Sequence, residues 1–245
     1  MLNWFSKKKE EELSPLNLSI LKTDIHSHFI PGIDDGSPDM ETSILLIKKM
    51  QELGYSRVIT TPHVMSDFYK NSSETILKGL ANVRSELKLQ NINMDIAAAA
   101  EYYLDFDFEQ KIGKEKFLTF GDNYILVELS FMQVPNNLFD IIFKLQMEGY
   151  KVVLAHPERY GYYNQEDYDN LIIRGVLLQI NLLSLIGYYS PQIQQKAKEL
   201  IAKNQVSFVG TDCHNMNHAE LYEKCQTKKA WHDLVNSGKL LNATL

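Results

Sequence analysis

The chain has 245 residues and a formal net charge of −6, with 44% hydrophobic and 23% charged residues. These values are ordinary for a globular protein that buries a sizeable core, and the length suits one large α/β domain. An acidic balance without a basic segment argues against a nucleic-acid partner. Two cysteines, Cys213 and Cys225, are too few for a disulfide framework, which fits a reducing cytoplasm.

Neither a membrane span nor a secretory signal is expected. No apolar run approaches the roughly 18 residues that cross a bilayer. The N-terminal sequence M-L-N-W-F-S-K-K-K-E-E-E-L has no apolar stretch followed by a cleavage site. Residues 1–20 are predicted to form a mobile lead-in. Residues 21–245 are predicted to form one domain, because no Gly-, Ser- or Pro-rich linker divides them.

Short runs typical of β-strands alternate with longer segments that carry helical signals. The seven expected strands lie at 22–25, 57–61, 95–100, 124–129, 151–155, 176–180 and 206–210. Helices are expected at 37–54, 74–89, 137–148 and 191–203, with one or two closing helices in 219–245. For the first helix, Ser37 is the predicted N-cap and Pro38 the first helical residue. The alternation predicts an α/β fold with a parallel sheet, either open or closed into a barrel.

Nine side chains that can bind metal, called the ligand set below, stand near the C-terminal ends of these strands. They are His26, His28, Asp35, His63, Glu101, Glu128, His156, Asp212 and His214. Six of the seven expected strands carry one at or just past the C-terminal end, where barrel enzymes place their active sites. Imidazole and carboxylate groups suit ions such as Mn, Zn or Fe, so the pattern predicts one shared metal site.

The motifs H-S-H and D-C-H are the sharpest local signals for metal. Residues i and i+2 of an extended segment point the same way, so His26 and His28 can reach one ion. Asp212 and His214 repeat this geometry with a carboxylate and an imidazole. Either motif alone would be compatible with a surface role. Together, near opposite ends of the chain, they favour a metal site.

The other members of the ligand set each have a structural alternative. Glu101 follows four alanines and Glu128 follows an apolar run, so each carboxylate either meets a cation or projects into solvent. His156 precedes a proline and could instead be a hydrogen-bonded core histidine. In D-D-G, both Asp34 and Asp35 remain candidates, because the following glycine also makes this a turn signal.

Arg159 is the arginine nearest to the ligand set, three residues beyond His156. Its guanidinium is suited to bind phosphate oxygens and to hold charge that develops in phosphoryl transfer. The structural alternative is an ion pair with Glu158 or with another acid.

A cysteine nucleophile of the C-x5-R type is not supported. No arginine stands at the required position after Cys213 or Cys225. Cys213 is interpreted as a filler between two ligands. His218 and His232 lie outside the pattern and are interpreted as surface or packing residues.

The motifs H-S-H, P-G-I-D-D-G, T-T-P-H, V-E-L, H-P-E-R-Y and G-T-D-C-H follow one another between residues 24 and 215. In these motifs the chain resembles the PHP superfamily of metal phosphoesterases, and within it the bacterial tyrosine-protein phosphatases of capsular and exopolysaccharide operons. The run H-x-H-x-x-P-G-I-D-D-G points to this subfamily rather than to histidinol phosphatases. The resemblance implies a single-domain, distorted (β/α)7 TIM-like barrel.

The resemblance also implies a site with three ions, usually manganese, although Zn, Fe or Mg would be compatible. By position, the first ion would be held by His26, His28, Glu101 and Asp212, the second by Glu101, Glu128 and His156, and the third by Asp35, His63 and His214. Arg159 matches an arginine that family members use on the substrate phosphate. A second arginine, typical of the family a few residues beyond D-x-H, is absent from the run 215–219.

The implied activity is hydrolysis of phosphotyrosine on proteins by a metal-bound hydroxide, without a covalent enzyme intermediate. The expected substrate is a bacterial tyrosine kinase that regulates capsule or exopolysaccharide synthesis. Two other classes stay open. One is a small-molecule phosphomonoesterase of the histidinol-phosphate or nucleotide type, and the other is a non-catalytic metal-binding regulatory module.

Overall fold

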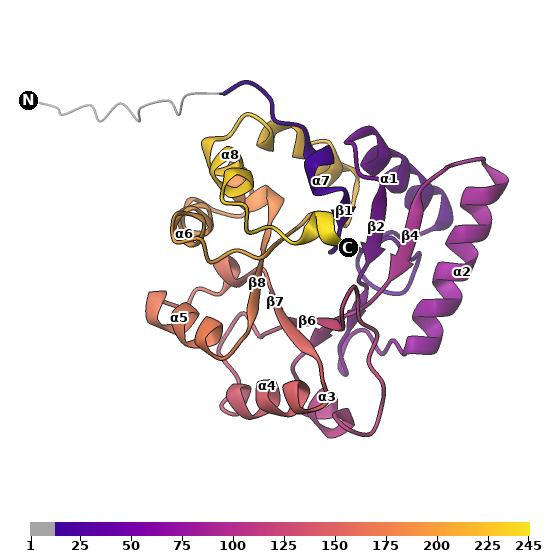
Figure 1. Cartoon of the computed structure of the whole chain (residues 1–245). Helices are drawn as coiled ribbons and strands as arrows, with labels where there is room; N and C mark the ends of the chain where they lie inside the picture. Colours follow the sequence, from indigo (N-terminus) through magenta and orange to yellow (C-terminus); the bar gives the residue numbers. More distant parts are fainter. Residues whose placement is uncertain (1–12) are drawn as a thin grey trace, which may run out of the picture.

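The structure is a computed structural model that describes residues 13–245. Parallel strands stand in the middle of the molecule, and helices surround them (Figure 1). The strands are β1 (Thr23–Asp24), β2 (Arg57–Thr60), β3 (His63–Val64), β4 (Asp95–Ala98), β5 (Glu101–Tyr103), β6 (Tyr124–Glu128), β7 (Lys151–Ala155), β8 (Leu177–Asn181) and β9 (Phe208–Gly210). They form two sheets, in the orders β1-β2-β4 and β3-β5-β6-β7-β8-β9, and every pair is parallel. The predicted α/β fold with a parallel sheet is confirmed.

The described strands number nine, whereas seven were expected, because two chain segments each form two short strands. β2 ends at Thr60 and β3 begins at His63, with Pro62 between them, which has no N–H to donate to a ladder. β4 and β5 are likewise separated by two alanines. The breaks move the pairing between sheets, since β2 pairs with β4 whereas β3 pairs with β5. The pairing is therefore continuous from β5 to β9, whereas the strands near the start of the chain are divided between the two sheets.

The first and last strands also meet. Ser27, beyond β1, forms an isolated parallel bridge with Cys213, beyond β9. His28 N donates to Cys213 O at 3.0 Å, and Asp212 N donates to His26 O at 2.7 Å. These bonds bring H-S-H and D-C-H side by side, although about 190 residues separate them in the sequence.

The α-helices are α1 (Met40–Glu52), α2 (Ser73–Leu89), α3 (Phe106–Lys111), α4 (Leu138–Met147), α5 (Gln165–Ile173), α6 (Pro191–Ala202), α7 (Met216–Ala219) and α8 (Lys229–Asn236). Short 3-10 turns are η1 (Leu18–Leu21), η2 (Pro157–Arg159), η3 (Leu182–Ile186), η4 (Tyr222–Cys225) and η5 (Asn242–Thr244). Helices α3 and α5 were not predicted. They have six and nine residues and bury only one and two side chains, too few to produce a clear helical period.

The predicted start of α1 is wrong by two residues. Asp39 is the N-cap, and its side chain accepts a hydrogen bond from Thr42 N at 2.8 Å. Ser37 instead belongs to the preceding loop, where its N–H donates to His28 O at 3.0 Å. Aspartate and serine are about equally good N-caps, so the local sequence could not decide between them.

The predicted lead-in falls into two parts. Residues 1–12, including the charged run 7–12, lie outside the described residues. Residues 13–20 pack onto the C-terminal region, because Leu13 N and Leu16 N donate to the carbonyls of Thr227 and Gln226 at 3.0 Å. Leu18 is fully buried. The folded domain therefore begins earlier than residue 21.

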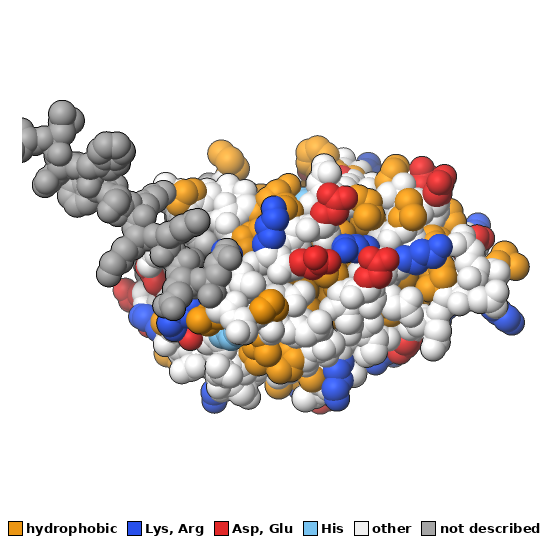
Figure 2. Space-filling view, turned by 90° about the horizontal axis from the view of Figure 1, so that it is seen from above, with side chains coloured by type: hydrophobic (Ala, Val, Ile, Leu, Met, Phe, Trp, Pro, Cys, Tyr) orange, Lys and Arg blue, Asp and Glu red, His pale blue; other side chains and the backbone are white. Residues whose placement is uncertain are grey.

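The described residues include no helix that could span a membrane, and the face shown in Figure 2 has no basic patch. No helix within residues 13–245 has the length and apolar character needed to cross a membrane. Viewed from above, acidic and basic side chains are interspersed, with small groups of hydrophobic side chains between them (Figure 2). This face matches the mixed composition and the modest negative charge.

Candidate metal centre

The ligand set comes together at the C-terminal ends of the parallel strands. Four overlapping groups have ligand atoms within 4.8 Å of one another: His28, Asp35, His63 and His214; His26, His28 and Glu101; His26, His156 and Asp212; and His63, Glu101 and Glu128. All nine predicted residues occur in these groups, and within residues 13–245 no other residue does. The clustering requires long-range strand pairing, because its members come from most of the chain.

Glu101 stands at the centre of this cluster. Its Oε2 lies 3.1 Å from His26 Nε2 and 3.1 Å from His63 Nδ1, while its Oε1 lies 3.1 Å from His156 Nε2. The residue is fully buried and is the first residue of β5, just after the strand break. A buried carboxylate that faces three imidazoles with both oxygens could bind a divalent cation through either oxygen.

Several buried nitrogen and oxygen atoms of the cluster have no hydrogen-bond partner among the described residues and are free to bind a metal ion. Within residues 13–245, His26 Nε2, His28 Nε2 and Glu101 Oε2 have no hydrogen-bond partner. The other nitrogen of each ring is taken, since His26 Nδ1 lies 2.8 Å from Gln179 Oε1 and His28 Nδ1 lies 2.8 Å from Asp34 Oδ2. These acceptors place the ring protons on Nδ1 and leave both Nε2 lone pairs directed at the cluster. The donor set therefore fits divalent cations.

Asp34 and Asp35, which the sequence could not separate, occupy different positions. Asp34 Oδ2 accepts from His28 Nδ1 and from His63 N, at 2.8 and 3.1 Å. Asp35 Oδ1 instead lies 3.6 Å from His63 Nε2 and 3.5 Å from His214 Nε2. Asp34 thus orients a histidine from behind, and Asp35 faces the ligand atoms.

Two glycines allow the close backbone approach that the cluster requires. A Cβ on Gly36 would lie 2.3 Å from His28 O, and a Cβ on Gly210 would lie 2.5 Å from His26 Cβ. Neither distance is compatible with a side chain. The glycine of D-D-G is therefore needed for its close packing against H-S-H.

Two members of the ligand set have left-handed backbone conformations. His156, directly after β7, has φ 35°, and Asp212, two residues after β9, has φ 53°. Non-glycine residues hold such angles only when the surrounding structure enforces them, and they concentrate at functional sites. Both residues belong to the group of ligand atoms that also contains His26.

Arg159 lies beside the cluster, in η2. Its guanidinium is stacked between the rings of Phe131 and Tyr189, at 4.8 and 4.6 Å, and its NH1 donates to Asp212 Oδ2 at 3.1 Å. Asp212 is therefore the acid that pairs with Arg159. Glu158 faces away, because its Oε1 accepts from the backbone N–H of β8 and from a hydroxyl of η3.

A cleft of about 500 Å³ opens above the cluster. Its lining includes six of the ligand set together with Met65, Tyr69, Phe131, Arg159, Tyr189, Asn215 and His218. The position of His218 was not expected, since it lines the cleft with its Nδ1 3.3 Å from Asp212 O. His232 lies elsewhere, 3.0 Å from Gln226 O.

The electrostatics of the cluster indicate an excess of negative charge. Burial, followed by the charges of Glu101 and Asp212, raises the pKa of Glu128 well above its usual range. Burial alone would also raise the pKa of Asp212, but His26 and His214, when protonated, and Arg159 lower it well below its usual range. Burial and nearby Arg159 lower the pKa of His156 to about 4, so this imidazole is neutral at pH 7. Cations between these carboxylates would relieve their mutual repulsion.

The residues that sequence reasoning missed support the ligand set from behind. Gln179 and Asn181 alternate on β8 and are fully buried, and Asn181 Nδ2 donates to Asp212 Oδ2 at 2.6 Å. β8 corresponds to the expected strand that carries no ligand of its own. Two polar residues at i and i+2 in an otherwise apolar strand were the available signal, because buried amides need partners.

The chain is similar to a known family and to curated relatives. The sequence model of the family described as capsular polysaccharide synthesis, CpsB/CapC, matches residues 22–233. Tyrosine-protein phosphatase YwqE of Bacillus subtilis is 31% identical over 200 residues, which cover 79% of this chain and 77% of the relative. Tyrosine-protein phosphatase CpsB of Streptococcus pneumoniae is 28% identical over 211 residues, which cover 81% and 85%.

Solved structures show the same fold. A chain from the crystal structures of YwqE from Bacillus subtilis and CpsB from Streptococcus pneumoniae, described as metal-dependent tyrosine phosphatases, matches with a TM-score of 0.78. It is 27% identical, and the match covers 87% of this chain and 91% of that one. An amidohydrolase from Mycoplasma synoviae matches with a TM-score of 0.54 at 13% identity, over 95% and 91% of the two chains. The latter likeness concerns the fold alone.

Proposed function

This chain belongs to the CpsB/CapC family of capsular polysaccharide synthesis, and on that premise we propose that it is a metal-dependent protein-tyrosine phosphatase. The relatives reported above carry this activity in their names. In the molecule itself, the proposal rests on one observation, the four overlapping groups of ligand atoms, two of which contain Glu101. Such a cluster can hold several divalent ions close together, which is the arrangement that metal-dependent phosphoester hydrolysis uses.

The proposed site holds three ions, with manganese as the preferred metal. The first would be held by His26, His28, Glu101 and Asp212, the second by Glu101, Glu128 and His156, and the third by Asp35, His63 and His214. When bound, the ions neutralise phosphate charge and activate a water as the nucleophile. No thiol is needed, and burial raises the pKa of Cys213 to about 12.

Arg159 is proposed to bind the phosphate group of the substrate. Its guanidinium is cationic at all relevant pH values, and its side chain is 24% exposed, toward the cleft. The rings of Phe131 and Tyr189 and the carboxylate of Asp212 hold it in place. A fixed guanidinium stabilises phosphate charge without reorganising during the reaction.

Aromatic side chains favour an aryl phosphate over the small-molecule alternatives. Tyr69 stacks on His63 with a centroid distance of 5.5 Å, and Phe131 stacks on His156 at 5.7 Å. Both rings line the cleft, and Phe131 is 46% exposed. A phenyl ring entering the cleft can pack against them, whereas histidinol phosphate and nucleotides place a flexible alkyl or ribose group there.

The physiological substrate is proposed to be a phosphorylated bacterial tyrosine kinase that controls capsule or exopolysaccharide synthesis. The family description names capsular polysaccharide synthesis, and tyrosine-protein phosphatases are among the relatives. A protein substrate also fits the open cleft, which lies at the surface.

We further infer that the strands occupy seven positions of a distorted (β/α)7 barrel. Counting β2 with β3 and β4 with β5 as two interrupted positions leaves seven. The bridge between Ser27 and Cys213 supports closure between the first and last of them.

The decisive experiment loads metal-stripped protein with Mn, Zn or Mg. It then measures phosphate release from p-nitrophenyl phosphate, a phosphotyrosine peptide and histidinol phosphate. We expect metal-dependent release, with the phosphotyrosine peptide preferred over histidinol phosphate. A strong preference for histidinol phosphate would support a small-molecule phosphatase, and no release from any substrate would support the regulatory module. Fewer than two ions per fully loaded chain would contradict the three-ion site.

A further inference from the structure

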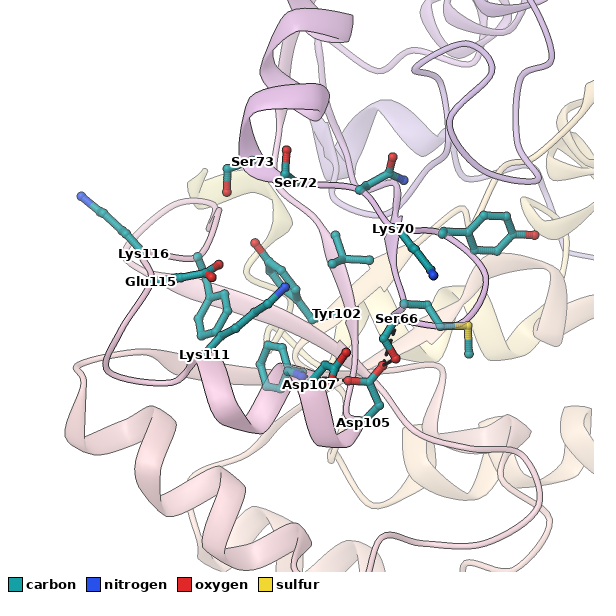
Figure 3. A pocket seen from close by; sticks show the side chains of 16 residues that line it. Ser66, Lys70, Ser72, Ser73, Tyr102, Asp105, Asp107, Lys111, Glu115 and Lys116 are labelled. Carbon is teal, nitrogen blue, oxygen red and sulfur yellow. Dashed lines mark hydrogen bonds between the residues drawn. The ribbon is translucent and has the colours of Figure 1, made fainter.

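A second hollow, called the side cavity here, adjoins the cleft. Its volume is about 280 Å³, and it lies between the segment 64–73, β5 and the region of α3 and the loop after it (Figure 3). Met65 and Tyr69 line both the cleft and the side cavity. A chain bound across the cleft can therefore place one of its side chains in this cavity.

The side cavity has an aromatic lining at its base. Tyr102, Phe108 and Phe117 are each no more than 5% exposed, and their ring centroids lie 4.8 to 5.4 Å apart. The Tyr102 hydroxyl is occupied, because it accepts a hydrogen bond from Leu118 N at 2.8 Å. This base can pack against an apolar or aromatic side-chain stem.

Lys70 and Lys111 are two of the lysines that line the side cavity. Figure 3 shows Lys111 directed toward the middle of the cavity and Lys70 on its opposite side, whereas Lys116 points away. Among residues 13–245, neither Lys70 nor Lys111 forms an ion pair, although carboxylates line the same cavity. Unpaired ammonium groups above an apolar surface attract an anionic group.

The carboxylates that line the side cavity are either hydrogen-bonded or exposed to solvent at its rim. Asp105 is engaged, because its Oδ2 accepts from Ser66 N and Ser66 Oγ, at 3.0 and 2.8 Å, and its Oδ1 accepts from Phe108 N. Asp107 and Glu115 are exposed at the rim, where solvent screens their charge. Lys70 is exposed like these two acids, whereas Lys111 is half-buried, and both ammonium groups are available to an anionic group.

We propose that the side cavity is a subsite for an anionic side chain close in sequence to the phosphotyrosine of the substrate. This inference rests on the proposed phosphatase function and deepens it, because it assigns a preference for the sequence around the phosphotyrosine. The apolar stem of the side chain packs on Phe108 and Phe117, and its anionic head lies between Lys70 and Lys111. A glutamate carboxylate and the phosphate of a second phosphotyrosine share this chemistry.

Peptide binding to the metal-loaded protein tests the subsite without depending on turnover. Each fluorescent peptide carries one non-hydrolysable difluoromethylphosphonate analogue of phosphotyrosine, and glutamate, glutamine or a second analogue is scanned through the neighbouring positions. At one position, glutamate should bind up to about fivefold more tightly than glutamine, as expected for a partly exposed charge pair. A larger gain with the second analogue would identify an aryl phosphate as the preferred occupant, and an equal gain would show that a carboxylate suffices.

The double variant Lys70→Met, Lys111→Met removes both charges and keeps the aliphatic stems. It should abolish the preference for the anionic peptide, with binding of the glutamine peptide unchanged. Lys114→Met, on the neighbouring loop and outside the side cavity, is the matched control and should keep the preference.

An anionic preference that survives in the double variant, or its absence at every position in the wild type, would overturn the subsite. Hydrolysis of p-nitrophenyl phosphate is measured in parallel and should be the same in all variants. If the wild type releases no phosphate, the phosphatase proposal fails, while the binding preference still decides the subsite.

Discussion

The interior of the strand assembly has two ends of opposite character. At the apolar end, the buried side chains form one cluster, made up of Ile25, Ile59, Ala99, Phe120, Leu126, Val153, Ala155 and Phe208. Toward the C-terminal ends, the same inner face carries the ligand set. On β6, for example, Leu126 and Glu128 are two residues apart and therefore point the same way.

The two ends differ in whether their buried groups find all their partners within the protein. The apolar end is complete with the protein alone, because its side chains are buried against one another. At the polar end, His26 Nε2, His28 Nε2 and Glu101 Oε2 are buried without hydrogen-bond partners within the described part of the chain. One end of the interior is therefore complete with protein side chains alone, while the other carries groups that could bind divalent cations.

Changing Glu101 should produce the largest effect, because it is central to the polar end. Glu101→Gln keeps the side-chain shape but removes the charge that would hold two ions. We expect fewer bound ions and a fall in kcat/KM of more than about a thousandfold, or about 4 kcal/mol. This loss exceeds the roughly 10–100-fold typical of residues that only support ligands. Metal analysis and assays with the phosphotyrosine peptide measure it, with exposed Glu220→Gln as control. Unchanged ion content would contradict the bridging role.

A substitution at the apolar end should lower the stability of the protein and leave the metal site intact. Phe208 is fully buried and packs edge-on against Phe120 and Tyr124, with centroids 5.7 and 5.2 Å away. Phe208→Ala should lower the free energy of unfolding by about 3–5 kcal/mol. Denaturant titration measures this loss, and Phe208→Leu should lose less. Folded Phe208→Ala protein with reduced ion content would show that the two ends are not separable.

Glu158 is a buried acid that lies outside the ligand set, so it allows the effect of burial to be measured separately from metal binding. Burial raises its pKa from 4.5 to about 7. A raised pKa means that the folded state favours the protonated form, so its contribution is full below pH 4.5 and is lost as pH rises through 7. The loss is roughly 3 kcal/mol.

Glu158→Gln should therefore make the metal-free protein roughly as stable as the wild type at pH 4.5, and more stable at pH 8. Urea titrations at both pH values in chelator measure the difference, and exposed Glu166→Gln should leave the pH dependence unchanged. Equal pH dependence in the wild type and Glu158→Gln would sink this prediction.

Arg159 lies at the border between the ion cluster and the substrate. Arg159→Ala should reduce kcat/KM by about a hundredfold, or about 2.7 kcal/mol, the loss typical of one preorganised charged donor. Arg159→Lys should recover part of the activity, since it restores charge but not the planar fork. Exposed Arg174→Ala is the control. A loss of threefold or less for Arg159→Ala would remove the residue from the mechanism.

The smallest expected effect concerns the aromatic wall of the cleft. Phe131→Ala should lower kcat/KM for aryl phosphates up to about tenfold more than for alkyl phosphates, because one aromatic pair contributes about 0.5–1.5 kcal/mol. Met132→Ala is the control, because its side chain is 88% exposed and lies outside the lining of the cleft. Equal losses on both substrate classes would mean that Phe131 acts only by holding Arg159.

Much of the fold was predictable from local patterns. The seven expected strands overlap observed strands, because apolar runs bounded by turn residues are a property of the sequence itself. The short strands β3 and β5 were not predicted; each follows a two-residue interruption at which the chain changes its pairing partner. The short helices α3 and α5 were missed because they bury few side chains.

The roles of individual polar residues were predictable only in part. The resemblance to the capsular phosphatase family is confirmed by the family match. The choice between Asp34 and Asp35 needed the position of His28 Nδ1, and the partner of Arg159 needed the position of Asp212. Gln179 and the position of His218 at the cleft emerged only from the structure.

The sequence by itself determined which residues can bind metal and that they follow strands, because residue type and strand period are local. Tertiary structure alone decided which atoms meet, since the first and last motifs are joined by the hydrogen bonds between residues 26–28 and 212–213. It also decided which polar groups face the cluster and which support it from behind. Those distinctions depend on side-chain direction and on contacts between distant segments, which no local pattern encodes.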